Sequence, residues 1–182
     1  MNVRRLTPAD AAAYRALMLS GYAAHPDAFT ATVEERAHLP LAWWEKRLAA
    51  DPAPEIVVGA FVGGELVGTA ALRLNERPKT RHHAFLFAVY VARAHTGRGA
   101  GAALMQGILA EAEARPWLSV IHLTVTEGNE RAKALYERAG FATFGVEPYA
   151  VLDEAGYRGK VHMWRPLSRL QQGTGRDAGE RV

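Results

Sequence analysis

The chain has 182 residues, 49% of them hydrophobic and 23% charged, which favours one compact domain over two and argues against a disordered or fibrous protein. It contains no cysteine, so disulfides, thiolate metal sites and a cysteine nucleophile are excluded. The formal net charge of +3, from 22 lysines and arginines against 19 acidic residues, is too small to predict nucleic-acid binding.

The first fifty residues predict a short edge strand and two helical regions. An N-cap and a proline at the first helical position, Thr7-Pro8, begin the first helix. In chain order, we expect a strand over 3–6, a helix to about residue 20, a loop over 25–30, and a helical region over 33–49 broken at Pro40. Trp43 and Trp44 cannot share one helical face, so Trp44 is assigned to the core and Trp43 to the surface, with a pocket or a subunit contact as the alternative.

The middle of the chain predicts an antiparallel hairpin and then a long strand that leads into glycines. Gly63-Gly64 joins the strand-like runs Ile56–Val62 and Leu66–Leu74, because glycine accepts the positive φ of a tight turn. His83–Val91 follows as a strand. Strict alternation along it places one set of side chains on the same face, namely His83, Phe85, Phe87, Val89 and Val91.

The remaining pattern completes a mixed α/β or α+β domain over residues 1–167. Asn129 caps the last predicted helix and Gly140 ends it. The expected elements are helices over 100–115 and 129–139 and strands over 118–126, 141–151 and 157–164. From Gln171 onward glycine and charge replace hydrophobic residues, so residues 168–182 are expected to form a flexible tail.

Neither a membrane segment nor a metal site is expected. No stretch reaches the roughly 18 uncharged apolar residues that cross a bilayer, and the opening Met-Asn-Val-Arg-Arg lacks the apolar core of a signal peptide. A cytoplasmic protein with no membrane partner follows. The neighbours His82 and His83 point to opposite faces of a strand, which does not favour a metal site.

Three glycines, Gly97, Gly99 and Gly101, stand at alternate positions between the long strand and the next helix. Without Cβ atoms there, a pyrophosphate can approach the backbone amides at the positive end of the helix dipole. We predict an anion site, with Arg93 and Arg98 adding charge from the side. A glycine-rich tight turn without a ligand is the alternative.

A dinucleotide site is a second interpretation of the same loop. Gly97-x-Gly99-x-x-Ala102 satisfies the dinucleotide fingerprint. That fingerprint expects a series of βαβ units and an acidic residue for the ribose, whereas hairpins flank this loop and Glu127 is a poor substitute for the acid. A nicotinamide-dependent oxidoreductase is therefore the less favoured function.

The order of elements and two motifs together resemble the GNAT superfamily of N-acetyltransferases over about residues 2–166. The first motif is the loop Thr96-Gly-Arg-Gly-Ala-Gly101, in which Thr96 stands where the family usually has Arg or Gln. The second, more specific motif is Asn129-x-x-Ala-x-x-Leu-Tyr136-x-x-x-Gly140-Phe141. It looks like the family signature Asn-x-x-Ala-x-x-x-Tyr-x-x-x-Gly-Phe.

The resemblance implies an enzyme that moves the acetyl group of acetyl-CoA to a primary amine by direct attack. It also implies a central, mostly antiparallel sheet of six to seven strands, with one parallel crossover at the cofactor site and about four helices. Carried over to this sequence, the backbone of Val89–Val91 pairs with the pantetheine arm, residues 97–102 hold the pyrophosphate and Asn129 contacts the cofactor arm. The implied acetyl-CoA-binding residues are Val89, Tyr90, Val91, Thr96, Gly97, Arg98, Gly99, Ala100, Gly101, Ala102 and Asn129.

Tyr136 is the candidate general acid. It shares a helical face with Ala132, Leu135 and Ala139 and so points inward, where its phenol can protonate the departing thiolate of CoA. A plain core tyrosine is the alternative. The resemblance also implies a backbone amide, that of Val89 or Val91, as the donor to the oxyanion.

The acceptor side has weaker candidates. An alkyl ammonium with a pKa of about 10.4 must lose a proton before it attacks a thioester. His83 is the candidate base, at a position where some family members carry a carboxylate, and a structural histidine is the alternative. Glu34 and Glu35 are candidate carboxylates that attract a cationic amine, with a solvated helix start as their alternative.

The acceptor is expected to be a small molecule, because no extended peptide groove is recognisable. The competing class is a GNAT-like domain that holds acyl-CoA without turnover, as a sensor or a structural subunit; Tyr136 and the candidate base favour catalysis. Homodimerisation is common in the resemblance, and the terminal strands offer exposed edges for it.

Overall fold

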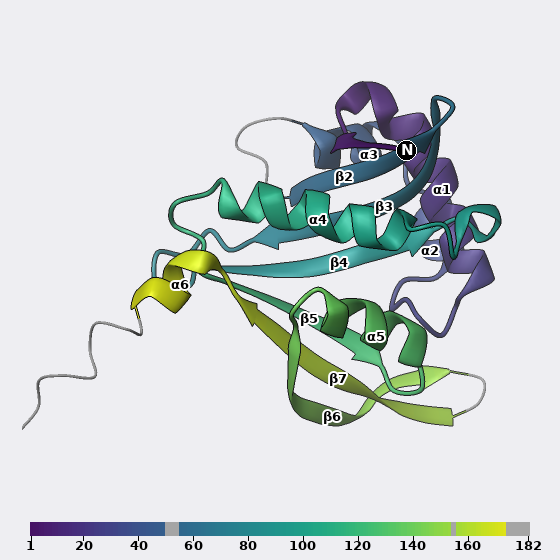
Figure 1. Ribbon diagram of the computed structural model, residues 1–182. Coiled ribbons are helices and arrows are strands. Elements are labelled where there is room, and N and C mark those ends of the chain that lie inside the picture. The colour runs from purple at the N-terminus through teal and green to yellow at the C-terminus, as the bar shows by residue number, and fades with distance from the viewer. Residues whose placement is uncertain (50–54, 154–155, 174–182) are drawn as a thin grey trace, which may run out of the picture.

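Seven strands and six α-helices make up most of the part of the chain that the computed structural model describes, residues 1–49, 55–153 and 156–173 (Figure 1). The strands are β1 Asn2–Arg5, β2 Glu55–Val62, β3 Glu65–Leu74, β4 His83–Val91, β5 Val120–Thr126, β6 Ala142–Asp153 and β7 Gly156–Pro166. The helices are α1 Ala11–Ala24, α2 Val33–Ala37, α3 Leu41–Leu48, α4 Ala100–Glu113, α5 Glu130–Arg138 and α6 Ser168–Gly173, with 3-10 turns η1 Pro8–Asp10 and η2 Arg93–His95.

All seven strands form one mixed sheet, in the order β1-β2-β3-β4-β5-β7-β6. Every neighbouring pair is antiparallel except β4 and β5, which run parallel on either side of the α4 crossover. The predicted fold class, the hairpin at Gly63-Gly64 and the single parallel crossover are confirmed. Within the described ranges, no helix has the length and apolar character needed to cross a membrane.

Apolar side chains form a core on each face of the sheet. On one face, buried residues of β2 to β5 pack against Leu104 and Ile108 of α4 and Tyr136 of α5. On the other face, Tyr14 of α1 and Trp44 of α3 pack on the sheet. Figure 1 shows α4 and α5 in front of the sheet and α1 behind it. Trp44 is buried as predicted.

The described chain has more α-helices than the expected four, because one predicted helical region is divided in two and a further helix follows the predicted domain. Pro40 lacks a backbone N–H and separates α2 from α3, whose N-cap it forms. Beyond the predicted domain end, Ser168–Gly173 forms α6 where the sequence predicts a flexible segment. The Glu113 carboxylate accepts from the Ser168 amide at 3.1 Å, and Arg169 donates to the Glu113 carbonyl at 2.8 Å. Residues 174–182 of the predicted tail lie outside the described residues.

A β-bulge in β4 overturns the predicted alternation of its side chains. Ala88 has φ +51°, and the pairing with β3 shifts register there. Phe87 and Tyr90 consequently pack with the α1 side of the sheet, whereas Val89 and Val91 pack with the α4 side. The expectation that Val89 and Val91 share a face with His83 is wrong because the bulge inserts one extra residue.

β4 and β5 separate soon after they meet. They pair at His83↔Val120, Ala84↔Ile121 and Phe85↔His122 only. The rest of β4, residues 86–91, therefore faces the end of β5 without ladder pairing between the two strands. This opening, called the wedge below, is where the candidate site lies.

We expect the backbone conformation at Ala88 to limit which residues are tolerated there. Ala88→Gly should leave the free energy of unfolding within about 1 kcal/mol of the parent, because relief of the left-handed conformation offsets the added freedom of the unfolded chain. Ala88→Val should lower it by about 2 kcal/mol or more, since a β-branched residue is poorly accommodated at positive φ. Urea unfolding measures both, and equal stability of the two variants would rule out the bulge geometry.

Candidate active site

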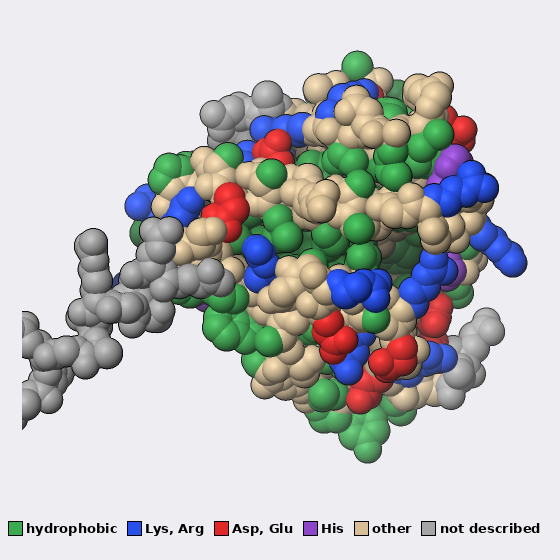
Figure 2. All heavy atoms as spheres, viewed as in Figure 1, with side chains coloured by type: hydrophobic (Ala, Val, Ile, Leu, Met, Phe, Trp, Pro, Cys, Tyr) green, Lys and Arg blue, Asp and Glu red, His purple; other side chains and the backbone are tan. Residues whose placement is uncertain are grey.

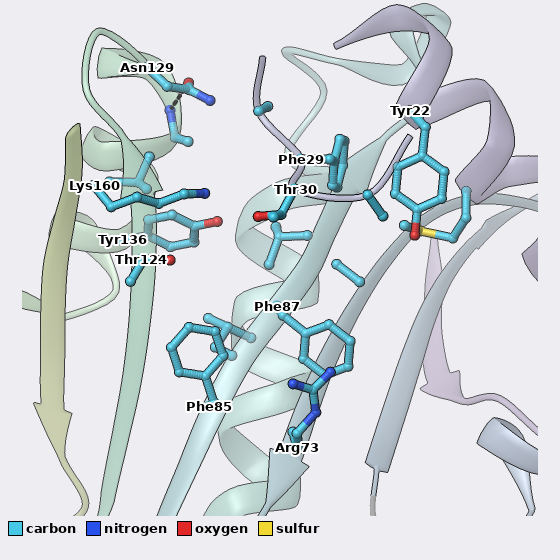
Figure 3. A pocket seen from close by; sticks show the side chains of 18 of the residues that line it. Tyr22, Phe29, Thr30, Arg73, Phe85, Phe87, Thr124, Asn129, Tyr136 and Lys160 are labelled. Carbon is cyan, nitrogen blue, oxygen red and sulfur yellow. Dashed lines mark hydrogen bonds between the residues drawn. The ribbon is translucent and has the colours of Figure 1, made fainter. Parts of the chain in front are cut away.

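The wedge opens into a cavity of about 300 Å³ lined from both faces of the fold (Figure 3). One half is lined by β5, β7, α5 and its cap, through Thr124, Val125, Asn129, Ala132, Tyr136 and Lys160. The other half is lined by α1, the segment that follows it, α2, α3 and β3, through Met18, Tyr22, residues 28–31, Arg36, Arg47 and Arg73. Phe85–Val89 of β4 lies between the halves.

The glycine loop lies at the carboxyl end of β4 and forms an open cradle of backbone amides. Gly97 and Gly99 have φ +76° and +83°, and nothing lies within 4 Å of a Cβ built at either position. Gly99 is the N-cap of α4, and the first intrahelical bond runs from the Ala103 amide to the Gly99 carbonyl at 3.0 Å. The amides of residues 100–102 therefore lack helical acceptors and are available to an anion.

The third glycine of the loop serves packing. A Cβ at Gly101 would lie 3.3 Å from the Leu135 side chain, so glycine lets α4 approach α5 closely. The Thr96 hydroxyl makes a local hydrogen bond, donating to the Arg93 carbonyl at 2.9 Å. Arg93 and Arg98 are exposed beside the cradle. Figure 2 shows blue Lys and Arg side chains gathered at the end of the hollow beside α4.

Asn129 and Tyr136 face the cavity from α5, as the helical pattern predicts. The Asn129 Oδ1 atom accepts from the Ala132 amide at 3.1 Å, which confirms the predicted cap and leaves the side-chain amide nitrogen outside that bond (Figure 3). The Tyr136 ring is 8% exposed and packs edge-on to Phe141, while its hydroxyl points into the cavity. Burial raises the pKa of Tyr136, so the phenol keeps its proton.

Lys160 and Thr124 were not singled out by the sequence analysis. Lys160 of β7 extends its ammonium group toward the cavity beside Tyr136 (Figure 3). Burial lowers the pKa of Lys160, and the nearby Glu147 carboxylate opposes that shift. Both residues lie on alternating strands without a local motif, so only the tertiary structure brings them to the site.

The candidate base His83 does not line this cavity. It lies at the start of β4, where its ring packs against His82 and His122 with ring centroids 4.0 and 5.0 Å apart. Burial, followed by the neighbouring His82, lowers the pKa of His83. The structure therefore separates His83 from Tyr136 and gives it histidine neighbours.

Glu34 and Glu35 are also outside the cavity, in the exposed first turn of α2. The Glu35 carboxylate accepts from the Thr32 amide at 2.8 Å, and the Glu35 amide donates to the Thr32 hydroxyl at 3.2 Å. This capping box gives Glu35 a structural role at the start of α2 that needs no ligand. The half of the cavity lined by α1 to α3 and β3 presents arginines, whereas the sequence predicts carboxylates on the acceptor side.

Two observations bear on the remaining sequence interpretations. The Glu127 carboxylate accepts from the Gly159 amide at 2.9 Å and thus ties the end of β5 to β7, which gives this residue a structural role. Across the described ranges, no group of three or more His, Asp or Glu side chains is arranged to hold a metal ion.

Comparisons with known proteins agree on one family. The model of the acetyltransferase (GNAT) family matches residues 18–141. Mycothiol acetyltransferase from Salinispora tropica is 32% identical over 142 residues, which is 76% of this chain and 43% of that protein. The chain thus spans less than half the length of this curated relative.

Solved structures share the fold at low sequence identity. The GNAT-family acetyltransferase from Streptococcus pneumoniae superposes with a TM-score of 0.76 at 23% identity, over 92% of this chain and 99% of that one. Ribosomal-protein-alanine N-acetyltransferase from Brucella melitensis gives 0.75 at 24%, over 92% and 100%. The structure of yncA from Salmonella typhimurium with its cofactor acetyl-CoA gives 0.74 at 23%, over 92% and 94%. Fold, motifs and family match converge, and the chain belongs to the GNAT acetyltransferase family.

Proposed function

We propose that this chain transfers the acetyl group of acetyl-CoA to the primary amine of a small molecule. The observation that carries the proposal is the wedge: the Tyr136 hydroxyl points into its cavity, and the amide cradle at residues 97–102 follows the end of β4, the strand that borders the wedge. Family membership supports the donor, because GNAT enzymes use acetyl-CoA. The limited volume of the cavity, about 300 Å³, supports a small acceptor.

The residues present fit acetyl-CoA along its length. The cradle offers amides without helical acceptors to a pyrophosphate. Residues 86–91 of β4 are not paired with β5 and leave a strand edge beside the cavity, which suits the amide-bearing pantetheine arm in the manner of strand addition. Asn129 adds a side-chain amide at the cavity wall.

The chemistry assigned to the cavity is direct transfer. The neutral amine nitrogen attacks the thioester carbonyl carbon and forms the C–N bond, while the C–S bond breaks and its electron pair moves to sulfur. Tyr136 donates its phenolic proton to that sulfur, and the nitrogen gives up one proton to water, which returns a proton to the Tyr136 phenolate. A backbone amide of Val89 or Val91 stabilises the charge that develops on the carbonyl oxygen.

No carboxylate or histidine lines the described cavity, so deprotonation of the amine falls to the local electrostatics and to water. Four cationic side chains line it: Arg36, Arg47, Arg73 and Lys160. Positive charge nearby lowers the pKa of a bound ammonium group and raises the share of neutral, nucleophilic amine. These four cationic side chains take the place of the dedicated base that the sequence predicts at His83.

A homodimer through the free edge of β6 is part of the proposal. Phe144, Val146 and Leu152 of this strand are each more than half exposed, and an edge strand with exposed apolar side chains pairs readily with another chain. Sedimentation at micromolar concentration should show a dimer that Phe144→Asp converts to a monomer. A parent chain that sediments as a monomer at a concentration on the order of 100 µM would contradict the proposed homodimer.

Removal of the Tyr136 hydroxyl should separate binding from turnover. We expect Tyr136→Phe to bind acetyl-CoA as the parent does and to release thiol at least about 100-fold more slowly, the usual effect of losing a general acid. The ring packing against Phe141 is kept, so the unfolding temperature should not change. Tyr149→Phe, in an exposed tyrosine of β6, is the matched control and should be fully active.

Thiol release in the presence of an amine panel is the readout for this comparison. Equal rates for Tyr136→Phe and the parent would show that the phenol is only a core residue. Acetyl-CoA binding without thiol release on any amine would identify the chain as an acyl-CoA-binding module instead.

The two roles of Asn129 can be tested separately. Asn129→Asp retains an oxygen that caps α5, so the stability should be unchanged, but it replaces the side-chain amide donor by an acceptor and should weaken acetyl-CoA binding about tenfold or more. Asn129→Ala should weaken binding and also lower the free energy of unfolding by about 1 kcal/mol. Asn75→Asp, in the exposed β3–β4 connection, controls for the added charge. Calorimetry with acetyl-CoA that shows no loss for Asn129→Asp would leave capping as the only role.

A further inference from the structure

The acceptor half of the cavity is lined by three arginines from three different elements. Arg36 comes from α2, Arg47 from α3 and Arg73 from β3. No aspartate or glutamate is among the residues that line the described cavity. A cavity intended for a simple cationic amine or a polyamine would show the opposite charge.

Two aromatic rings connect the guanidinium groups of this arginine trio. The Trp43 ring lies 5.1 Å from the Arg36 guanidinium carbon and 4.6 Å from that of Arg47. The Phe87 ring lies 5.6 Å from Arg47 and 4.7 Å from Arg73. Figure 3 shows Arg73 against the ring of Phe87 at the wall of the cavity. Stacking of this kind holds the guanidinium planes in fixed positions and leaves their edges available for hydrogen bonds.

The positive charge of the trio is only partly balanced. Glu55 contacts Arg47 at 2.7 Å and Arg73 at 3.4 Å, so one carboxylate serves two guanidinium groups and Arg36 has no such partner among the described residues. The Nε atoms of Arg36 and Arg47 are buried without a hydrogen-bond acceptor in the described structure. With one carboxylate for three guanidinium groups, the trio keeps a net positive charge, which points to an anionic partner that arrives with the substrate.

Arg73 is distant from the glycine loop. It pairs in the sheet with Phe85, and its guanidinium carbon lies 4.7 Å from the ring of Phe87, four residues before Val91 at the end of β4. At about 3.3 Å per residue, that separation is roughly 13 Å along the strand. A pyrophosphate held at residues 97–102 is therefore out of reach of a direct hydrogen bond from Arg73, which remains for the acceptor.

We infer that the acceptor is a small primary amine that also carries an anionic group, a carboxylate or a phosphonate, which the trio of Arg36, Arg47 and Arg73 binds. This inference rests on the proposed acetyl transfer and specifies its substrate class. The anionic group offsets the positive potential of the cavity and orients the molecule. Its amino group then lies among cations, which favours the neutral nucleophile. Polyamines, which carry several positive charges, are repelled.

The test compares matched amines in a thiol-release assay with acetyl-CoA. One set is phenylalanine, phenylalaninamide and phenethylamine, which differ in the presence of the carboxylate, and a second set is β-alanine, 2-aminoethylphosphonate and propylamine, which separates carboxylate from phosphonate. Spermidine represents polyamines. We expect kcat/KM to be at least tenfold higher for a member that carries a carboxylate or phosphonate than for the members of its set that lack an anionic group.

Variants of the trio locate the effect. Arg36→Gln and Arg73→Gln should each lower kcat/KM for the preferred anionic amine by tenfold or more, chiefly through KM, and leave acetyl-CoA binding unchanged. Arg77→Gln, at an exposed arginine that follows β3, is the control and should match the parent. Circular dichroism confirms that the variants fold.

The outcomes separate this inference from the proposal on which it rests. If acetyl-CoA binds but amines without an anionic group, spermidine included, react as fast as those that carry one, or no amine with an anionic group reacts at all, the inference is wrong and the donor assignment stands. Faster reaction of phenylalaninamide than of phenylalanine would favour a peptide amino terminus instead. If acetyl-CoA itself does not bind, the proposed transfer fails, and the inference fails with it.

Discussion

The separation of β4 from β5 is the feature on which the rest of the site depends. Two parallel strands that begin in register would normally continue as a ladder, but pairing ends at Phe85↔His122. The unpaired strand edge and the cavity beside it exist only because of this divergence. The bulge at Ala88 lies within it and turns Val89 and Val91 toward the α4 side, while Phe87 and Tyr90 stay with the α1 side. One irregular strand thus contributes to both halves of the cavity.

The two halves carry complementary tasks. The α4 and α5 side offers backbone amides at the glycine loop and a buried phenol at Tyr136, groups that bind anions and give up protons. The α1 to α3 side offers fixed guanidinium groups stacked on Trp43 and Phe87. Because both halves are rich in donors, the cavity is suited to ligands that bring negative charge from each end. In the proposed transfer, an amine that reacts between them is exposed to a positive potential that favours its neutral form.

Local sequence signals predicted the helix caps and the orientation of Tyr136 but not the arginines on the other side of the cavity. The caps at Asn129 and Gly140 and the inward position of Tyr136 follow from short-range rules, and the structure agrees with each. The bulge has no such signal, since alanine is not a residue that favours positive φ. The arginine trio comes from three separate elements, so no spacing in the sequence brings its members together.

Glu35 and His83, two residues predicted to act at the site, do not line the cavity, and each has an identifiable structural reason. Glu35 satisfies the first turn of its own helix, which a sequence pattern of Thr32 followed three residues later by glutamate also allows. His83 lies on β4, which borders the cavity, but at the end where β4 pairs with β5, and its ring contacts other histidines there. In both cases residue type suited the chemistry, and the tertiary position did not.

Amide hydrogen exchange with and without acetyl-CoA reports where along the backbone the donor binds. We expect new protection in two segments, residues 86–91 of β4 and residues 97–102 of the glycine loop, with little change in β1, β2 and β6. Protection confined to other segments, or none at saturating acetyl-CoA, would contradict the claim that the wedge between β4 and β5 is the acetyl-CoA site.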